Sequence, residues 1–466
     1  MRAISRFRSR RTPIGVAVLA TAGLVVGGVI LTGPASATAG PTAHRITVHP
    51  EVFQAGAKAP DATFGCQNRP MDGSQGPRCY QAAQIQNAYN ITPLLNSGIN
   101  GTGRTIVIVD AFGSPTIATD LQTFDAVMGL PNPSFTQITP AGSPPPFDVN
   151  DPNQFGWSVE TTLDVEWAHV TAPGANIVLA VAPSNNDTDI LNTTKAVVDN
   201  NVGDVISQSF GEAEACMDST LLDQQHAVFA DAVKKGITLF ASSGDSGASQ
   251  PSCDGTGALF SASTPASDPN VTAVGGTTLT ADPTTGAYQS ETAWTEPFGC
   301  NPPAVAPSDV NCSGGGFSSV YARPDYQSAL QKNRNRGVPD VAYNAGVSGG
   351  VLIFSATINA AFGLPPNSLT FFIVGGTSAG SPQWAGLAAD ADQLAGHRMG
   401  NINPALYSIA QAKKQYASAL HDITTGNNDV AEIGGGFDAG ARWDAVTGVG
   451  TPNAAALLPL LVKRTS

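Results

Sequence analysis

Basic residues are scarce in this sequence. Its 466 residues include 23 lysines and arginines against 36 aspartates and glutamates, and charged residues make up 13% of the chain, where about 25% is usual. Without residues 1–37, which hold five arginines and no acidic residue, 18 basic and 36 acidic residues remain, a net charge of −18. Nucleic acids and anionic membranes bind basic surfaces, so we expect neither as a partner. An acidic medium suits such a chain, because protonation relieves repulsion among its carboxylates.

The chain also lacks the CxxC pairs and mixed clusters of cysteine and histidine that bind zinc. Its six cysteines are instead typical of an exported protein with disulfide bonds. They fall into three pairs of sequence neighbours, which we predict to be the bridges among the many possible connectivities: Cys66 with Cys79, Cys216 with Cys253, and Cys300 with Cys312.

The N-terminus has the pattern of an export signal. Arginines precede an uncharged apolar run from Ile14 to Thr32, and Ala35-Ser36-Ala37 is a small-residue cleavage motif. We predict a signal peptide over residues 1–37 and a secreted, extracellular product. The alternative is a retained membrane anchor, because the run approaches the roughly 20 residues that span a bilayer. Residues 38–79 are predicted to be an irregular N-terminal segment or a short propeptide, followed by one domain over 80–466.

From Tyr80 onward, short apolar runs alternate with longer segments of helical pattern. Runs of this length predict strands buried on both faces, as in a parallel sheet covered by helices. The alternation predicts an α/β fold, a doubly wound domain with a mainly parallel central sheet flanked by helices. The expected strands are residues 104–112, 175–183, 204–210, 237–244 and 270–279.

Two serines stand in stretches that look like nucleophile motifs. Ser246 lies in "SSGDSGA", a pattern of chymotrypsin-like proteases, but the all-β architecture and the "AAHC"-like histidine of that class are missing. Ser378 lies in "GGTSAGSP", before a helix expected to run to about Ala395. A helix N-terminus favours a developing oxyanion. On position alone, however, a helix N-cap is the simpler interpretation of Ser378.

A base for Ser378 is not evident among the six histidines, at positions 44, 49, 169, 226, 397 and 421, because none has the "HGT"-like context of subtilisin-like proteases. The helix expected over 158–171 offers two carboxylates instead. Glu160 and Asp164 are four residues apart and so adjacent on one face, rotated away from His169. Like charges at this spacing cost a helix roughly 0.2–0.5 kcal/mol. The two carboxylates are therefore either solvent-exposed side chains without a function or part of a functional site.

Taken together, the sequence resembles the sedolisin family, the serine-carboxyl peptidases, which share the subtilisin-like fold but use a glutamate in place of its histidine. The resemblance spans about residues 80 to 465 and rests on motifs in a fixed order, among them "ETTLDVEWAHVTAPGA", "VISQSFGE", "SSGDSGA", "PASDPNVTAVGGTTL", "GGTSAGSPQWAG" and "GARWDAVTGVGTP". It implies that 80–466 is a sedolisin-like peptidase domain. It further implies Ser378 as nucleophile, Glu160 as general base, Asp164 as the residue that orients this base, and Asp245 as oxyanion partner.

These implied roles require acid. A glutamate with a reference pKa near ~4.3 is a weak base at pH 7, and general bases work best near their own pKa. Asp245 must be protonated to donate a hydrogen bond to the oxyanion, whereas an ionised Asp245 would repel it. The expected function is that of a secreted, monomeric, acid-active endopeptidase that acts on proteins or peptides. Two alternatives stay open: a catalytically idle relative that binds peptides or surface polymers, and a subtilisin-like protease that uses His169.

The resemblance also implies one structural Ca²⁺ ion near the C-terminus. Its ligands would be the carboxylates of Asp422 and Asp444 and the main-chain oxygens of Ile423, Gly440 and Arg442, since calcium prefers oxygen ligands. The alternative is that the two aspartates satisfy loop turns. Arg442 replaces the glycine usual at its position, so the site depends on whether its backbone angles can be reached.

The sequence departs from the family in two other places. Some members extend the carboxylate network with a glutamate at the end of the first strand and a tryptophan beyond the "SQS" strand. Here Asp110 and Phe210 take these positions, so we expect the extension to be absent. Members also usually carry a prodomain of well over a hundred residues, where only about forty residues separate the predicted signal from the domain here.

Overall fold

The computed structural model describes residues 44–48, 50–57, 63–296, 300, 311–365, 368–430 and 433–465. The predicted signal peptide and its cleavage site after Ala37 lie outside these residues. Ala35–Ser466 form one compact unit, and the description below concerns that unit alone. Within the described ranges, no helix combines the length and the apolar character needed to cross a membrane.

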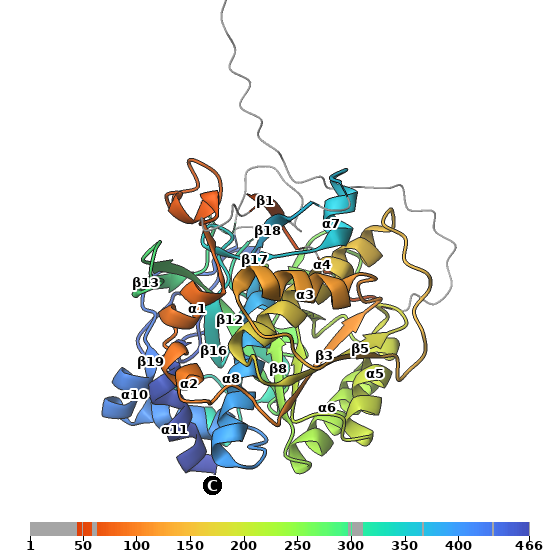
Figure 1. The fold of residues 1–466 in the computed structure, drawn as a ribbon. Coiled ribbons are helices and arrows are strands. Elements are labelled where there is room, and N and C mark those ends of the chain that lie inside the picture. The colour runs from red at the N-terminus through yellow and green to blue at the C-terminus, as the bar shows by residue number, and fades with distance from the viewer. Residues whose placement is uncertain are drawn as a thin grey trace, which may run out of the picture. The chain divides into compact units, whose positions relative to one another are not determined.

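A mainly parallel sheet of eight strands forms the centre of this unit (Figure 1). Its strands lie in the order β13-β12-β8-β6-β3-β5-β4, and β16 also pairs with β12. Of these strands, β13 alone runs antiparallel to its neighbour. The five predicted strands are all present and the α/β expectation is confirmed: β3 (Thr105–Ala111), β5 (Asn176–Ala182), β6 (Val205–Gln208), β8 (Thr238–Ser242) and β12 (Thr272–Ala281), joined by β4 (Phe135–Ile138), β13 (Tyr288–Ala293) and β16 (Val341–Asn344).

Helices cover both faces of the sheet. Helices α4 (Pro152–Thr171) and α8 (Gly380–Ala395) pack together on one face, and α5 (Asp187–Asp199) and α6 (Ser219–Lys234) lie side by side on the other (Figure 1). Alternate residues of a strand point to opposite faces. In β3, Ile106 and Ile108 therefore join the core beneath α4 and α8, while Val107 and Val109 join the core beneath α5 and α6. Helix α3 (Ile117–Met128) packs on α4.

The ends of the long helices follow from local sequence. Asp151 caps α4 through its carboxylate, which accepts a hydrogen bond from the Asn153 N–H at 2.9 Å, and Pro152 occupies the first helical position. Helix α8 ends at Ala395, as predicted, because Gly396 adopts the left-handed conformation with φ +74°. These signals fix where α4 and α8 begin and end, and hence which of their residues face each other.

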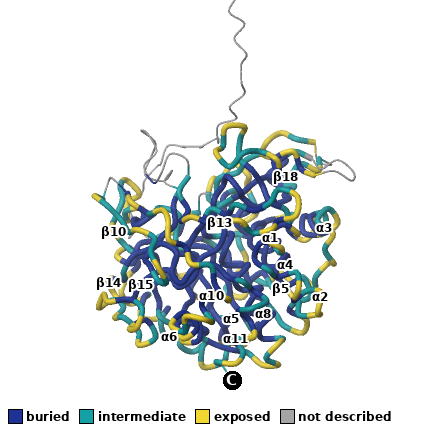
Figure 2. Tube along the Cα trace, turned by 90° about the vertical axis from the view of Figure 1, so that its left-hand side faces the viewer, coloured by how far each residue is buried: buried dark blue, intermediate teal, exposed yellow. Residues whose placement is uncertain are grey.

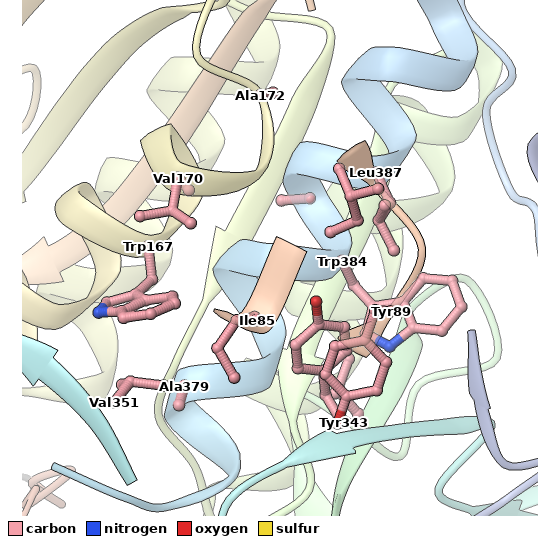
Figure 3. Close-up of a cluster of buried hydrophobic side chains, with 14 of the residues drawn as sticks. Ile85, Tyr89, Trp167, Val170, Ala172, Tyr343, Val351, Ala379, Trp384 and Leu387 are labelled. Atoms are coloured by element: carbon pink, nitrogen blue, oxygen red, sulfur yellow. The ribbon is translucent and has the colours of Figure 1, made fainter. Parts of the chain in front are cut away.

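Aromatic side chains lock α8 into the core (Figure 3). The rings of Tyr89 and Tyr343 lie 4.0 Å apart between centroids, close to Trp384 of α8. The indole of Trp384 donates to the Ala342 carbonyl at 3.0 Å. The indole of Trp167, from α4, donates to the Leu352 carbonyl at 3.0 Å. Both buried indoles have partners, so helices α4 and α8 are held by directed bonds as well as by apolar contact.

A second sheet of four strands corrects the expectation for residues 38–79. Its order is β1 (Val52–Ala57), β18 (Thr370–Val374), β17 (Gly350–Ile353) and β2 (Cys79–Tyr80). The segment predicted to be irregular thus contributes a full strand, and the domain boundary predicted at residue 80 falls inside β2. The sequence "VFQAGA" has no continuous apolar run, and its strand conformation comes from antiparallel pairing with β18 rather than from local propensity.

Three disulfide bonds link neighbouring cysteines. The predicted pairs Cys66–Cys79, Cys216–Cys253 and Cys300–Cys312 are all confirmed. Figure 2 shows the central strands and α8 buried, with exposed residues along the outer loops. The remaining elements are η1 (Gly65–Asn68), α1 (Ala82–Ala88), α2 (Thr92–Asn96), β7 (Glu212–Ala213), β9 (Ser249–Pro251), β10 (Ala258–Phe260), β11 (Ser263–Thr264), β14 (Gly316–Ala322), η3 (Asp325–Gln327), β15 (Asn335–Val338), α7 (Ala356–Ala361), η4 (Thr377–Ala379), α9 (Asn403–Gln411), α10 (Lys413–Ala419), β19 (Leu420–His421), β20 (Thr451–Pro452) and α11 (Ala454–Thr465).

Candidate active site

Ser378 lies in the turn between β18 and α8. Strand β18 ends at Val374, two glycines follow, and Ser378 is the middle residue of the short helix η4 that precedes α8. The N-cap residue of α8 is Ala379, so the interpretation of Ser378 as a helix cap is wrong. The residue is partly exposed, and its hydroxyl donates a hydrogen bond to the Ser209 carbonyl at 3.2 Å.

Glu160 is the carboxyl group next to Ser378. It is buried on α4, with 2% of its surface exposed. Burial raises its pKa well above the usual range, the nearby Ser378 hydroxyl opposes this, and the negative charges of Asp110 and Asp245 add to the rise. The structure thus brings three of the four predicted catalytic side chains, Glu160, Asp245 and Ser378, into one electrostatic environment.

Asp164, one helical turn beyond Glu160, is fully buried. Its pKa is raised well above the usual range, first by burial and then by Asp110 and Glu160, whereas the nearby Ser209 hydroxyl lowers it. Neither Asp164 oxygen has a well-aligned hydrogen bond within the described residues. Two buried carboxyls one turn apart cannot both ionise cheaply, so Glu160 and Asp164 titrate as a coupled pair.

Asp110 extends this carboxyl cluster, and the expectation that the extension is absent is wrong in this respect. It is the next-to-last residue of β3 and is fully buried, and burial raises its pKa to about 7, with the Thr161 hydroxyl acting in the opposite direction. Phe210, by contrast, offers no polar group and packs against Trp157, 5.7 Å between ring centroids. The position of Asp110 at the end of a buried strand was a signal that could have identified it.

Asp245 follows β8 and faces the glycines before Ser378. Its Oδ1 accepts hydrogen bonds from the backbone N–H of Thr377 at 2.8 Å and from the Thr377 hydroxyl at 2.6 Å. Burial raises the pKa of Asp245, and these two bonds oppose the rise. A Cβ at Gly376, where φ is +106°, would lie 2.6 Å from Asp245 Oδ2, so the close approach requires glycine. Oδ2 remains available to carry a proton.

His169 does not take part in this arrangement. Its imidazole is fully buried, and Nε2 lies 2.6 Å from the Pro131 carbonyl. Burial lowers its pKa to about 4. A neutral, enclosed imidazole that is bonded to another segment cannot accept the proton of Ser378, so the geometry disfavours the alternative in which His169 is the base.

The N-terminal segment reaches the site, which the sequence did not indicate. Pro50 and Glu51 line a small cavity together with Asp245 and Gly376. The Glu51 carboxylate accepts a hydrogen bond from the Asn311 amide at 2.7 Å. Part of the segment considered as a propeptide therefore lies beside the predicted oxyanion partner.

The predicted calcium ligands gather in a C-terminal loop. Asp422 Oδ1 accepts hydrogen bonds from the Tyr416 hydroxyl and from the Arg442 N–H, both at 2.8 Å, and the same hydroxyl lies 3.1 Å from the Arg442 carbonyl. Asp444 is 7% exposed, accepts from the Gly440 N–H at 3.0 Å, and burial raises its pKa to about 6. Arg442 adopts φ +72°, so the backbone angle in question is reached. Ile423 is buried beside Asp422.

This oxygen-rich loop fits a hard cation such as calcium, since the Asp422 and Asp444 carboxylates and the Arg442 carbonyl all lie around Tyr416. A left-handed conformation costs a residue with a side chain about 1–2 kcal/mol relative to glycine. The loop therefore holds a conformation that is unfavourable for Arg442 in itself and that the surrounding contacts must stabilise.

Comparison with known proteins gives consistent matches. Residues 151–417 match the model of the Subtilase family. Kumamolisin from Bacillus sp. (strain MN-32) is 32% identical over 407 residues, 84% of this chain and 65% of that protein. Sedolisin from Pseudomonas sp. (strain 101) is 30% identical over 367 residues, 78% of this chain and 58% of that protein. The chain therefore spans less than two thirds of the length of these relatives.

A solved structure agrees with these sequence matches. Pseudomonas sedolisin, a serine-carboxyl proteinase complexed with two molecules of pseudo-iodotyrostatin, matches with a TM-score of 0.70 and 28% identity, over 84% of this chain and 100% of that chain.

Proposed function

The chain belongs to the sedolisin family within the subtilases, and on this basis we propose that it is a serine-carboxyl peptidase that hydrolyses proteins or peptides through an acyl-enzyme on Ser378. The observation that carries the proposal is the proximity of the partly exposed Ser378 to the buried Glu160 carboxyl, close enough for the Ser378 hydroxyl to oppose the rise in the pKa of Glu160. A nucleophile and a base within hydrogen-bond reach are the minimum that acyl transfer needs.

In the proposed mechanism, Ser378 Oγ attacks the substrate carbonyl carbon while Glu160 takes the hydroxyl proton. The carbonyl oxygen becomes an oxyanion, to which the protonated Oδ2 of Asp245 donates. Glu160 then returns its proton to the leaving amine, and the C–N bond breaks. Water repeats the sequence on the acyl-enzyme, which releases the acid product and restores Ser378.

Asp164 and Asp110 act on Glu160 rather than on substrate. Each is buried near it, and their charges raise the pKa values within the cluster. The three carboxyls share protons, so that a proton taken up by Glu160 changes the protonation of its neighbours. In the proposed mechanism, Asp164, one turn along α4, orients Glu160 toward the nucleophile.

Activity in acid follows from the protonation states. The raised pKa of Asp245 keeps this carboxyl protonated to a higher pH than a free aspartate. Once Asp245 ionises, it repels the oxyanion and the rate falls. Glu160 can accept a proton only while the cluster of Glu160, Asp164 and Asp110 holds a negative charge, so the rate also falls as acidification fully protonates the cluster.

We further propose a secreted, monomeric enzyme with one structural calcium ion. The carboxylates of Asp422 and Asp444 and the carbonyls of Ile423, Gly440 and Arg442 would hold the ion. Calcium supplies positive charge that binds these oxygens together, and it takes no part in the chemistry. Its ligands lie in the C-terminal loop between β19 and β20, outside the carboxyl cluster.

The deciding experiment is a pH–rate profile from pH 3 to 8 on a denatured protein substrate, with products identified by mass spectrometry. We expect a maximum in acid and cleavage at internal bonds. A Ser378→Ala protein, purified in the same way, controls for contaminating proteases. The absence of hydrolysis at every pH would identify an idle relative, and a rate that climbs through about pH 6.5 would indicate a histidine base.

A further inference from the structure

A second group of titratable side chains lies at the start of α5. His44 comes from the N-terminal segment, Asp187 is the first residue of α5, and Glu212 lies on β7. One potential ligand atom from each lies within 4.8 Å of the other two. His44 Nδ1 and Glu212 Oε2 are 2.8 Å apart. The N-terminal segment therefore meets α5 and β7, which lie more than a hundred residues further along the chain, at one point.

Backbone contacts hold His44 in this place. The Ile46 N–H donates to the Asn185 carbonyl at 2.9 Å, and the Asn185 side-chain amide donates to the Ile46 carbonyl at 2.7 Å. The Asp187 N–H points to the His44 carbonyl at 3.3 Å. The imidazole is thus positioned by the strand-like attachment of residues 44–46 to the loop before α5.

Apart from the contact of Glu212 Oε2 with His44, the oxygens of the two carboxyls lack partners within the described residues. Asp187 is 4% exposed and Glu212 is 8% exposed. Within the described residues, neither Asp187 oxygen nor Glu212 Oε1 has a well-aligned hydrogen bond. Burial raises the pKa of both carboxyls, that of Glu212 to about 9, and the nearby Asp187 adds to the rise at Glu212. Buried oxygens of this kind need a proton or a cation between them.

A pocket of about 390 Å³ gives access to this group of residues, and His44, Asp187 and Asp218 are among its lining residues. Its size allows water to enter and complete the coordination of an ion. The sulfurs of Cys216 and Cys253 also lie near His44, but they are bonded to each other, so the carboxylates are the available ligands.

We propose that His44, Asp187 and Glu212 form a binding site for a divalent transition-metal ion of the zinc class. One imidazole nitrogen and two carboxylate oxygens are a donor set that zinc accepts, whereas calcium prefers oxygen alone. Zinc bonds of about 2.0–2.2 Å place tetrahedral ligand atoms roughly 3.4 Å apart. Small side-chain rotations bring atoms that already lie within 4.8 Å into this geometry. The ion would fasten residues 44–48 to α5 and β7.

The test uses the Ser378→Ala variant, so that proteolysis cannot remove residue 44, and intact mass confirms that this residue is present. The protein is stripped with a chelator and dialysed, and calcium is added in excess to fill any oxygen site. Zn²⁺ is then titrated at pH 7 against a chromophoric chelator. We expect one Zn²⁺ per chain with a dissociation constant at or below about 10 μM. His44→Gln and Asp187→Asn should each weaken binding at least about tenfold.

His397→Gln is the matched control, because His397 is exposed and its Nδ1 contacts the carbonyl of the adjacent Arg398 at 2.9 Å. This variant should bind like the parent. If Asp187→Asn does not fold, His44→Gln decides alone, since His44 precedes every helix and strand described. No Zn²⁺ uptake, or equal uptake by parent and His44→Gln, overturns the proposal. X-ray absorption should show one imidazole with oxygen ligands, and sulfur ligation or oxygen alone would also overturn it.

Discussion

The imidazole of His169 lies against the carboxyl of Asp125, with 3.3 Å between Nε2 and Oδ1, and both side chains are fully enclosed. Burial lowers the pKa of the histidine to about 4 and raises that of the aspartate to about 7. Over most of the pH range between these two pKa values, both side chains are therefore uncharged. Their contact belongs to the packing of α3 on α4. His169 therefore has a structural role, whereas Glu160 is the proposed base.

Glu160→Gln and His169→Gln should therefore behave in opposite ways. The glutamine at 160 keeps the size of the side chain but removes the base, so the rate should fall by at least the ~10²–10⁴-fold attributed to general-base catalysis. His169→Gln should leave kcat of the folded protein nearly unchanged, although it can lower the melting temperature. Kinetics of both variants from pH 3 to 8 are the measurement. A dead His169→Gln beside an active Glu160→Gln would overturn the serine-carboxyl mechanism.

Ser378→Ala should abolish hydrolysis without affecting the fold, because the side chain is partly exposed and caps no helix. Ser246→Ala is the matched control, since Ser246 lies in the other nucleophile-like motif and should be dispensable. Circular dichroism and melting temperature confirm that both variants fold. Activity in purified Ser378→Ala, or its loss in Ser246→Ala alone, would refute the assignment.

Asp245→Asn should extend activity to higher pH and lower the peak rate. An amide donates to the oxyanion at any pH, but it cannot reproduce the geometry of a carboxylic acid anchored by Thr377. Thr377→Val also tests the role of Asp245, but it keeps the Asp245 carboxyl and changes its pKa instead. It removes the hydroxyl bond that lowers the pKa of Asp245, so the alkaline limb of the profile should move upward. Profiles that coincide with that of the parent in both variants would make Asp245 structural.

Calcium removal should affect stability more than chemistry. A ligand that binds only the folded state stabilises it by about 2.7 kcal/mol at a hundredfold excess over its dissociation constant. A chelator, or Asp444→Ala, should therefore lower the melting temperature while kcat of the still-folded fraction changes little. Scanning calorimetry with and without added Ca²⁺ measures this. A melting temperature that changes with neither chelator nor added Ca²⁺ would exclude the proposed calcium site.

Asp390→Asn should flatten the pH dependence of stability. Asp390 is fully buried on α8, and burial alone raises its pKa well above the usual range. In the unfolded chain the carboxyl ionises near pH ~3.9, while the folded chain keeps the proton. Its contribution is therefore fully present below that pH and is lost as pH rises toward the folded pKa. Asparagine does not titrate.

The measurement is the free energy of unfolding in denaturant from pH 3 to 7. The parent should lose stability relative to Asp390→Asn as pH rises, and the two should differ least at pH 3. Parallel curves for the two proteins would show that Asp390 ionises in the folded state at its ordinary pKa.

Local patterns were enough to predict five of the eight strands of the central sheet and the pairing of two of the four catalytic candidates. The strand from Thr105 to Ala111 is continuously apolar from Ile106 to Val109, and Gly396 marks the end of α8. Glu160 and Asp164 could be paired because one helical turn separates them. Such signals act within a few residues, where spacing alone decides which side chains are neighbours.

Other features depend on contacts that no local pattern records. Strand β1 exists because β18 pairs with it, and the proximity of Asp110 to Asp164 depends on how α4 packs on β3. His44 and Glu212 are 168 residues apart and meet only because the N-terminal segment attaches to the loop before α5. The contacts of these residues arise from the tertiary arrangement, which a single sequence does not reveal.

The pairing of β1 with β18 also determines what can lie beside the nucleophile. Val374, the last residue of the strand that leads to Ser378, is flanked by Val52 on one side and Val351 on the other. Over Phe372–Val374, β18 is an interior strand that pairs with β1 along one edge and with β17 along the other. A foreign extended chain that sought to add itself there would find no open row of N–H and C=O groups. It would first have to displace residues 52–57.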